Sequence, residues 1–211
     1  MPHASVLSVT RWSNYHAWNG ALARHFFSSE FAGLPAYIDA DSETLEAVAD
    51  EIGVERLNAA GALAQAVHAT IVGQSGGIQL AEHTSRFVAW RSASLTPTHA
   101  VLKTGEAAEL TPPPVVALLT ICVLAAGRMG ADPNLPPHAY YPRLGEVLGL
   151  DFKEAESLKR AFPVTEWYWR GINEFLEASE GRLGLPTAYA LGHRYVGIPQ
   201  SQALVRATDR A

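Results

Sequence analysis

The chain has 211 residues, of which 48% are hydrophobic and 18% are charged, a globular composition that excludes a disordered chain. Its net charge is −5, with 16 Lys and Arg against 21 Asp and Glu. Because binding along nucleic acid needs cations that neutralise phosphates, this balance argues against broad, non-specific adhesion to DNA or RNA. The single cysteine, Cys122, excludes an internal disulfide and favours a reducing compartment.

The start of the chain and its apolar runs bear on localisation. The opening stretch MPHASVLSVTRW lacks the charged start and the long apolar segment of a signal peptide. The longest apolar run spans 115–126 and is shorter than the about twenty residues that cross a bilayer. We therefore expect a cytoplasmic protein without a membrane partner, in which 115–126 is a buried core helix.

The first half of the chain predicts helices and two short strands. Residues 5–10 and 35–40 have the short extended pattern of strands. Apolar residues recur with helical spacing elsewhere, which predicts the helices 14–27, 42–52, 54–72 and 78–90. Asn14 is expected to cap the first of these helices, and Asp41 or Ser42 the second.

The second half predicts further helices joined by proline-rich and glycine-rich segments. The prolines at 112–114 suit the first positions of the apolar helix 115–126. Shorter helices are predicted at 144–148, 153–161, 165–178 and 200–210, and strands at 98–104 and 195–196. The last helix has no stop signal before Ala211, which favours a chain that continues past this residue over a frayed end.

These elements predict a mainly α fold with a few short β-strands. The proline-rich loop 132–142 could divide the chain, but it is short, and the helix before it is too apolar to stand exposed. We therefore expect a single domain, residues 1–211, around the buried helix 115–126. This domain is expected to be the N-terminal part of a longer protein.

One short motif has the pattern of a catalytic serine. Residues 73–77 read Gly-Gln-Ser-Gly-Gly, which matches Gly-x-Ser-x-Gly, the turn that exposes the nucleophile in α/β-hydrolases. Ser75 would be the nucleophile and His193 its base, with Asp132 or Asp151 as the orienting acid, because the order along the chain is the required one.

Two features oppose the catalytic interpretation. The helical spacing within 54–72 indicates that a helix, not a strand, leads into the motif. The buried parallel strands of that fold are also scarce in this sequence. We therefore expect residues 73–77 to connect two helices, with a serine hydrolase as the alternative.

The spacing of residues indicates neither a metal site nor a nucleotide-binding loop. The eight histidines lack the short paired spacing of zinc ligands, and the sequence contains neither a GxxxxGK[ST] loop nor a GxGxxG after a strand. We expect no metal and no cofactor.

Two segments are candidates for binding. In TEWYWRGIN, Trp167, Tyr168 and Trp169 stand beside Arg170, and consecutive residues on a helix point in different directions, so we expect at least one of these aromatics to lie off the core, with the packing of all three as the alternative. An exposed Trp beside an Arg can anchor a partner protein or stack on an unpaired base. The other segment is basic and would contact an acidic partner or phosphates through Arg182, Arg194, Arg206 and Arg210.

Two stretches, YHAWNGALARHFF near the start and RLGLPTAYALGHRYVGIPQSQALVRATDR at the end, resemble the N-terminal region of large multi-domain bacterial proteins from antiphage defence loci. The resemblance implies a bacterial cytoplasmic protein and a recognition or assembly module, and it supplies no catalytic residue. Together with the absence of catalytic spacing, it favours a non-catalytic interaction module with a protein partner. The alternatives are a serine hydrolase and a nucleic-acid-binding module.

Overall fold

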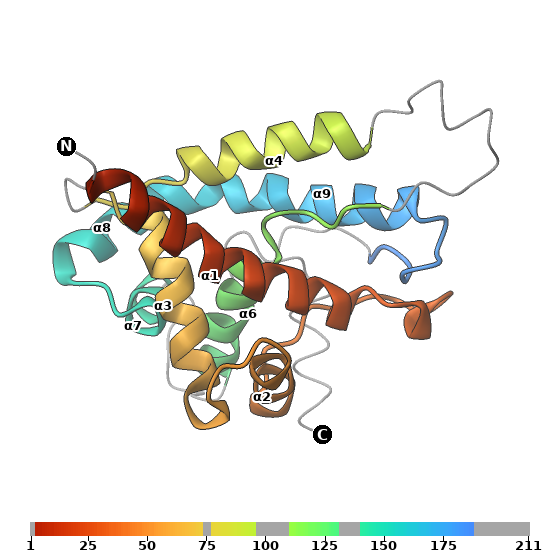
Figure 1. Ribbon diagram of the computed structural model, residues 1–211, viewed down its shortest axis with the longest axis horizontal. Coiled ribbons are helices and arrows are strands. Elements are labelled where there is room, and N and C mark those ends of the chain that lie inside the picture. Colours follow the sequence, from red (N-terminus) through yellow and green to blue (C-terminus); the bar gives the residue numbers. More distant parts are fainter. Residues whose placement is uncertain (1–2, 74–76, 96–109, 131–139, 188–211) are drawn as a thin grey trace.

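The computed structural model describes residues 3–73, 77–95, 110–130 and 140–187, and helices dominate these ranges (Figure 1). In chain order the helices are α1 (His3–Phe26), η1 (Ser29–Phe31), α2 (Ser42–Glu51), η2 (Arg56–Asn58), α3 (Ala59–Ile71), α4 (Ala81–Ser94), α6 (Val116–Gly130), α7 (Tyr140–Leu148), α8 (Phe152–Ala161), η4 (Phe162–Val164) and α9 (Thr165–Ala178). The prediction of a mainly α protein is confirmed.

The two strands predicted in the first half of the chain are wrong. Residues 5–10 belong to α1, which begins at His3, because each residue added to an existing helix gains a further backbone hydrogen bond. The segment 36–40 has no regular secondary structure, because a strand needs a partner, and within the described ranges this part of the chain forms only an isolated bridge between Pro35 and Leu185. The strands predicted at 98–104 and 195–196 lie outside the described residues.

The helix boundaries follow the sequence closely in some places and less so in others. The helix predicted at 165–178 is α9, with the same bounds. Asp41 caps α2 as expected, because its side chain accepts from the Thr44 N–H at 2.7 Å. Asn14, by contrast, lies inside α1 and caps no helix end. Within the described ranges, no helix combines the length and the apolar character needed to cross a membrane.

The apolar helix predicted at 115–126 lies in the core, as α6. Its residues Val115 to Ala126 are buried, apart from the half-buried Leu124. In Figure 1, α6 stands behind α1 and α3, and it packs against both of them and against α7 and α9. Burial on every side explains why this helix carries no polar face.

The proline segment before α6 is held by side chains from other helices. Three side chains donate to its carbonyl oxygens: Trp90 Nε1 to Thr111 O (2.7 Å), Asn19 Nδ2 to Pro113 O (3.0 Å) and Tyr15 Oη to Pro114 O (3.0 Å). The amide oxygen of Asn19 also accepts from the Ala117 N–H at 3.2 Å, in the first turn of α6. These bonds join α1 and α4 to the start of the core helix.

The outer helix α4 lies next to α9, and the two run in the same direction (Figure 1). The Phe87 ring packs against Trp167 and Tyr168, with ring centroids 4.7 Å and 5.0 Å away. A Cβ atom on Gly171 would lie only 2.3 Å from the Phe87 ring. Glycine at this position therefore leaves room for the Phe87 ring of α4 against α9.

Candidate functional site

The glycine-rich stretch follows a helix. After α3 ends at Ile71, the chain reverses, and two backbone bonds close the turn: Gly73 N–H to Gly77 O (2.9 Å) and Gln79 N–H to Ile71 O (2.7 Å). A nucleophile elbow needs a strand that enters the turn, so residues 59–71 do not supply the context that the catalytic alternative requires. Ser75 and His193 lie outside the described residues.

Of the two acids considered for that alternative, Asp151 has a structural role. It is the N-cap of α8, where its carboxylate accepts from the Glu154 N–H at 2.8 Å. The Glu154 side chain in turn accepts from the Asp151 N–H at 3.0 Å, which completes a capping box. Asp132 lies outside the described residues.

The aromatic cluster of α9 divides between the core and the surface. Trp169 is only 2% exposed and Tyr168 is buried, whereas Trp167 is half-buried. Trp167 thus lies at the edge of the core, against which it packs. Trp169 is a core residue in this structure, whereas Trp167 stays partly accessible.

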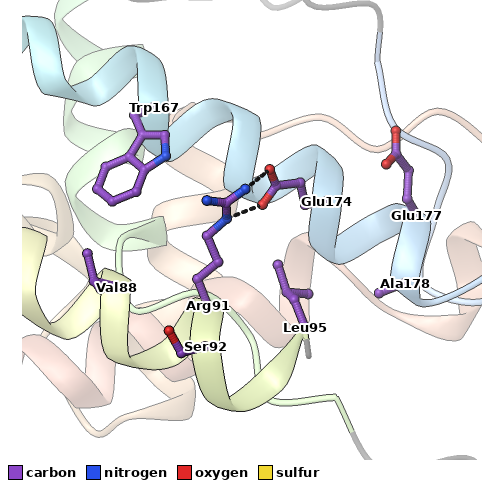
Figure 2. Close-up of a pocket in the computed structure, with 8 residues that line it drawn as sticks. All are labelled: Val88, Arg91, Ser92, Leu95, Trp167, Glu174, Glu177 and Ala178. Atoms are coloured by element: carbon purple, nitrogen blue, oxygen red, sulfur yellow. Dashed lines mark hydrogen bonds and ion pairs between the residues drawn. The ribbon is translucent and has the colours of Figure 1, made fainter. Parts of the chain in front are cut away.

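Trp167 lies at one end of a groove between α4 and α9 that has a volume of about 560 Å³ (Figure 2). The groove is lined by Val88, Arg91, Ser92 and Leu95 of α4 and by Trp167, Glu174, Glu177 and Ala178 of α9. On each helix these residues follow the spacing of one helical face. The groove is thus the place where the outer faces of the two helices meet.

An ion pair crosses the middle of the groove. Arg91 binds both carboxylate oxygens of Glu174, with Nε to Oε2 at 2.7 Å and Nη2 to Oε1 at 2.6 Å. These hydrogen bonds and the charge of Glu174 raise the pKa of Arg91. The carboxylate of Glu177 has no partner among the described residues. The groove therefore has an apolar end at Trp167, a neutralised middle and an acidic end at Glu177.

The predicted cationic residues are only partly described. Arg170 pairs with Glu166 one turn earlier on α9, at 2.8 Å. Arg182 lies just after α9, where its Nε donates to Ser179 O at 3.0 Å. Arg194, Arg206 and Arg210 lie outside the described residues, so a joint basic surface stays a prediction.

Comparison with protein-family models, with curated proteins and with solved structures finds no match to this chain.

The groove residues of α4 are absent from the sequence predictions. Val88, Arg91 and Leu95 follow one face of a helix, but Glu174 and Glu177 come from a segment about eighty residues later, and only the packing of α4 on α9 brings the two sets together. The one usable signal is that α4 has a narrow buried stripe, which leaves much of its surface uncovered. Among the described residues, no three His, Cys, Asp or Glu side chains are grouped as metal ligands.

Proposed function

We propose that this chain is a non-catalytic interaction module that binds a segment of a partner protein in the groove between α4 and α9. The observation that carries the proposal is the half-buried Trp167 at the end of that groove. Tryptophan is enriched among the residues that supply most of the binding energy in protein interfaces, and such anchors lie in pockets that water leaves on binding.

The charges in the groove indicate the chemistry of the partner. Arg91 and Glu174 neutralise one another, which leaves Glu177 as the charge that a partner can complement. Trp167 and Glu177 are ten positions apart on α9, about 15 Å along the helix axis. A partner segment that fits would therefore carry an apolar side chain for the Trp167 end and an Arg or Lys for the Glu177 end.

The cellular setting of this module is a further part of the proposal. The resemblance to N-terminal regions from antiphage defence loci supports a bacterial cytoplasmic complex in which the chain serves recognition or assembly. A serine hydrolase has less support, because α3 rather than a strand leads into residues 73–77. A nucleic-acid-binding module would depend on arginines beyond residue 187.

A peptide-display selection against the folded chain tests the proposal. We expect it to enrich peptides that combine a bulky apolar residue with an Arg or Lys. Trp167→Ala should weaken their binding at least about tenfold, as loss of an anchor does. Glu177→Lys should favour acidic peptides over basic ones.

Phe152→Ala is the matched control, because Phe152 is a large aromatic that is 81% exposed at the start of α8, away from the groove. It should leave peptide binding unchanged, and thermal melting should show that each variant is folded. Peptides that bind wild type and Trp167→Ala equally well would refute the groove as the binding site.

A further inference from the structure

The contact between α1 and the first half of α4 is built around Trp12, which lies between two histidines. The ring of His16, on α1, has its centroid 5.6 Å from that of Trp12, and the ring of His83, on α4, lies 4.9 Å away. The Arg86 guanidinium lies over the Trp12 ring at 3.9 Å, a favourable cation–π arrangement. Charged and titratable groups from both helices thus meet at a single aromatic ring.

In this arrangement the Nε2 atom of His16 must carry no proton. Arg86 Nη1 lies 3.3 Å from His16 Nε2. A guanidinium has only donors, so the histidine nitrogen must accept, and it can do so only without its proton. Partial burial and the charge of Arg86 both lower the pKa of His16. Protonation of His16 would remove this hydrogen bond and place a second cation beside Arg86.

His83 must also be neutral, for a different reason. Its Nε2 lies 2.9 Å from the Thr70 hydroxyl on α3, and that hydroxyl donates to Val67 O at 2.7 Å. The His83 N–H is therefore the donor, which leaves Nδ1 unprotonated. His83 is fully buried, and its Nδ1 has no partner among the described residues. Burial lowers the pKa of His83 to about 3, and the nearby Glu82 opposes this shift only in part.

The charge balance around the two histidines leaves no counter-ion for an added proton. The Glu82 carboxylate, on α4, already binds two guanidiniums: Arg86 at 2.9 Å and Arg11, on α1, at 3.2 Å. The other groups that face His83 are Trp12, the phenol of Tyr15 and the Thr70 hydroxyl, all uncharged. A protonated histidine here would add a third cation to a cluster with one carboxylate.

We propose that this cluster is a pH-sensitive latch, in which mildly acidic pH favours local opening of the first half of α4 away from α1, because His16 and His83 take up protons in the opened state. The second half of α4 stays attached, because Trp90 binds Thr111 O and Arg91 binds Glu174. Phe87 joins the released half to Trp167, so the release also changes the groove between α4 and α9. Only this effect on the groove rests on the proposed function.

The expected size of the effect follows from linkage. Such a histidine is neutral in the closed state and has its ordinary pKa of about 6.5 once released. Above that pH the histidine stabilises the closed state, and this stabilisation is lost as the pH falls because the released histidine takes up a proton. For His83 alone, the opening equilibrium then rises about tenfold between pH 7.5 and pH 5.5.

Hydrogen exchange of individual backbone amides, corrected for the intrinsic pH dependence of exchange, tests the proposal. We expect the amides of residues 84–87 to open about tenfold more often at pH 5.5 than at pH 7.5, while those of α6 change little. His83→Gln keeps a donor for Thr70 but cannot titrate, so it should abolish most of this difference. His16→Gln should reduce it.

His25→Gln is the matched control, since His25 lies on the same helix α1 and its ring contacts Phe26 rather than α4. It should keep the wild-type pH dependence. Equal protection of residues 84–87 at both pH values would overturn the latch, and so would equal loss of protection in α6. If His83→Gln does not fold, the NMR titration of wild-type His83 decides, because an ordinary pKa in the folded chain contradicts the latch.

Discussion

At the scale of single residues, Gly171 leaves the space that the Phe87 ring of α4 occupies on α9. Phe87 fills the space where a side chain at this position would lie, and the ring packs against Trp167 and Tyr168 at the same time. Any Cβ atom at position 171 would collide with the Phe87 ring and displace it. The shape of the groove and the packing of Trp167 therefore depend on a residue that has no side chain.

We expect Gly171→Ala to lower the free energy of unfolding by about 1–3 kcal/mol, because an added methyl group overpacks the contact. Gly20→Ala is the comparison. Gly20 also lies within a helix, but its nearest neighbour would be the end of the Arg24 side chain at 3.4 Å. That variant should be as stable as wild type or slightly more so, since Ala favours helix. Denaturant titrations of both variants give the measurement, and equal stability of Gly171→Ala and wild type would contradict the prediction.

At the scale of elements, α6 begins at a proline-rich segment whose carbonyl oxygens bind side chains of α1 and α4. Asn19 is the central contact, because its amide bridges Pro113 O and the Ala117 N–H. Both partners lie in the interior, and a buried polar group without a partner is costly. One side chain of α1 therefore anchors the start of the core helix.

Replacement of Asn19 by Ala should destabilise the protein by about 2–4 kcal/mol, since it leaves two buried backbone groups unpaired. Asn173→Ala serves as the control, because Asn173 makes one bond, to Thr187 O at 2.9 Å, in a half-buried place. We expect it to cost about 1 kcal/mol. Thermal melting of the two variants distinguishes them, and a smaller loss for Asn19→Ala than for Asn173→Ala would show that Asn19 is not an anchor.

The caps of the short helices act at the same scale. Asp151→Ala removes the hydrogen bond that the Asp151 carboxylate accepts from the Glu154 N–H at the start of α8 and should cost about 1 kcal/mol. Asp151→Asn, which can still accept from the Glu154 N–H, should retain most of the stability. The comparison is again made by denaturant titration, and identical losses in the two variants would mean that the cap hydrogen bond contributes little.

At the scale of the whole molecule, the core is built around α6. The helices α1, α3 and α7 pack on it, and Cys122 lies within this shared interior. Burial raises the pKa of the Cys122 thiol to about 12, so the reactive thiolate is scarce at neutral pH. Access to this sulfur requires that the helices around α6 separate.

Labelling of Cys122 should therefore report the opening of the core. At pH 8 we expect iodoacetamide to react more than about a thousandfold more slowly with the native chain than with the denatured chain, because both the thiolate fraction and access fall on folding. Cys122→Ser provides the unlabelled reference. Native labelling as fast as denatured labelling would mean that Cys122 is not in a closed core.

Local features could be predicted from the sequence, because they depend on neighbouring residues. The Asp41 cap needs only Thr44 three positions later, and α9 ends where its helical pattern ends. The apolar run that became α6 is long enough to be recognised without any knowledge of its neighbours. These patterns can be recognised without knowing which distant segments of the chain lie beside them.

Other features depend on the tertiary structure, because it sets which distant segments lie beside each residue. The stretch 5–10 is helical because α1 includes it, whereas the segment 36–40 has no strand to pair with in the described part of the chain. Trp167 and Trp169 are two positions apart and point in different directions, and the tertiary structure places the first beside Phe87 at the groove and the second in the core. Contacts between residues about eighty positions apart, such as Phe87 with Trp167 and Arg91 with Glu174, depend on how α4 and α9 pack, and no local pattern in the sequence encodes that packing.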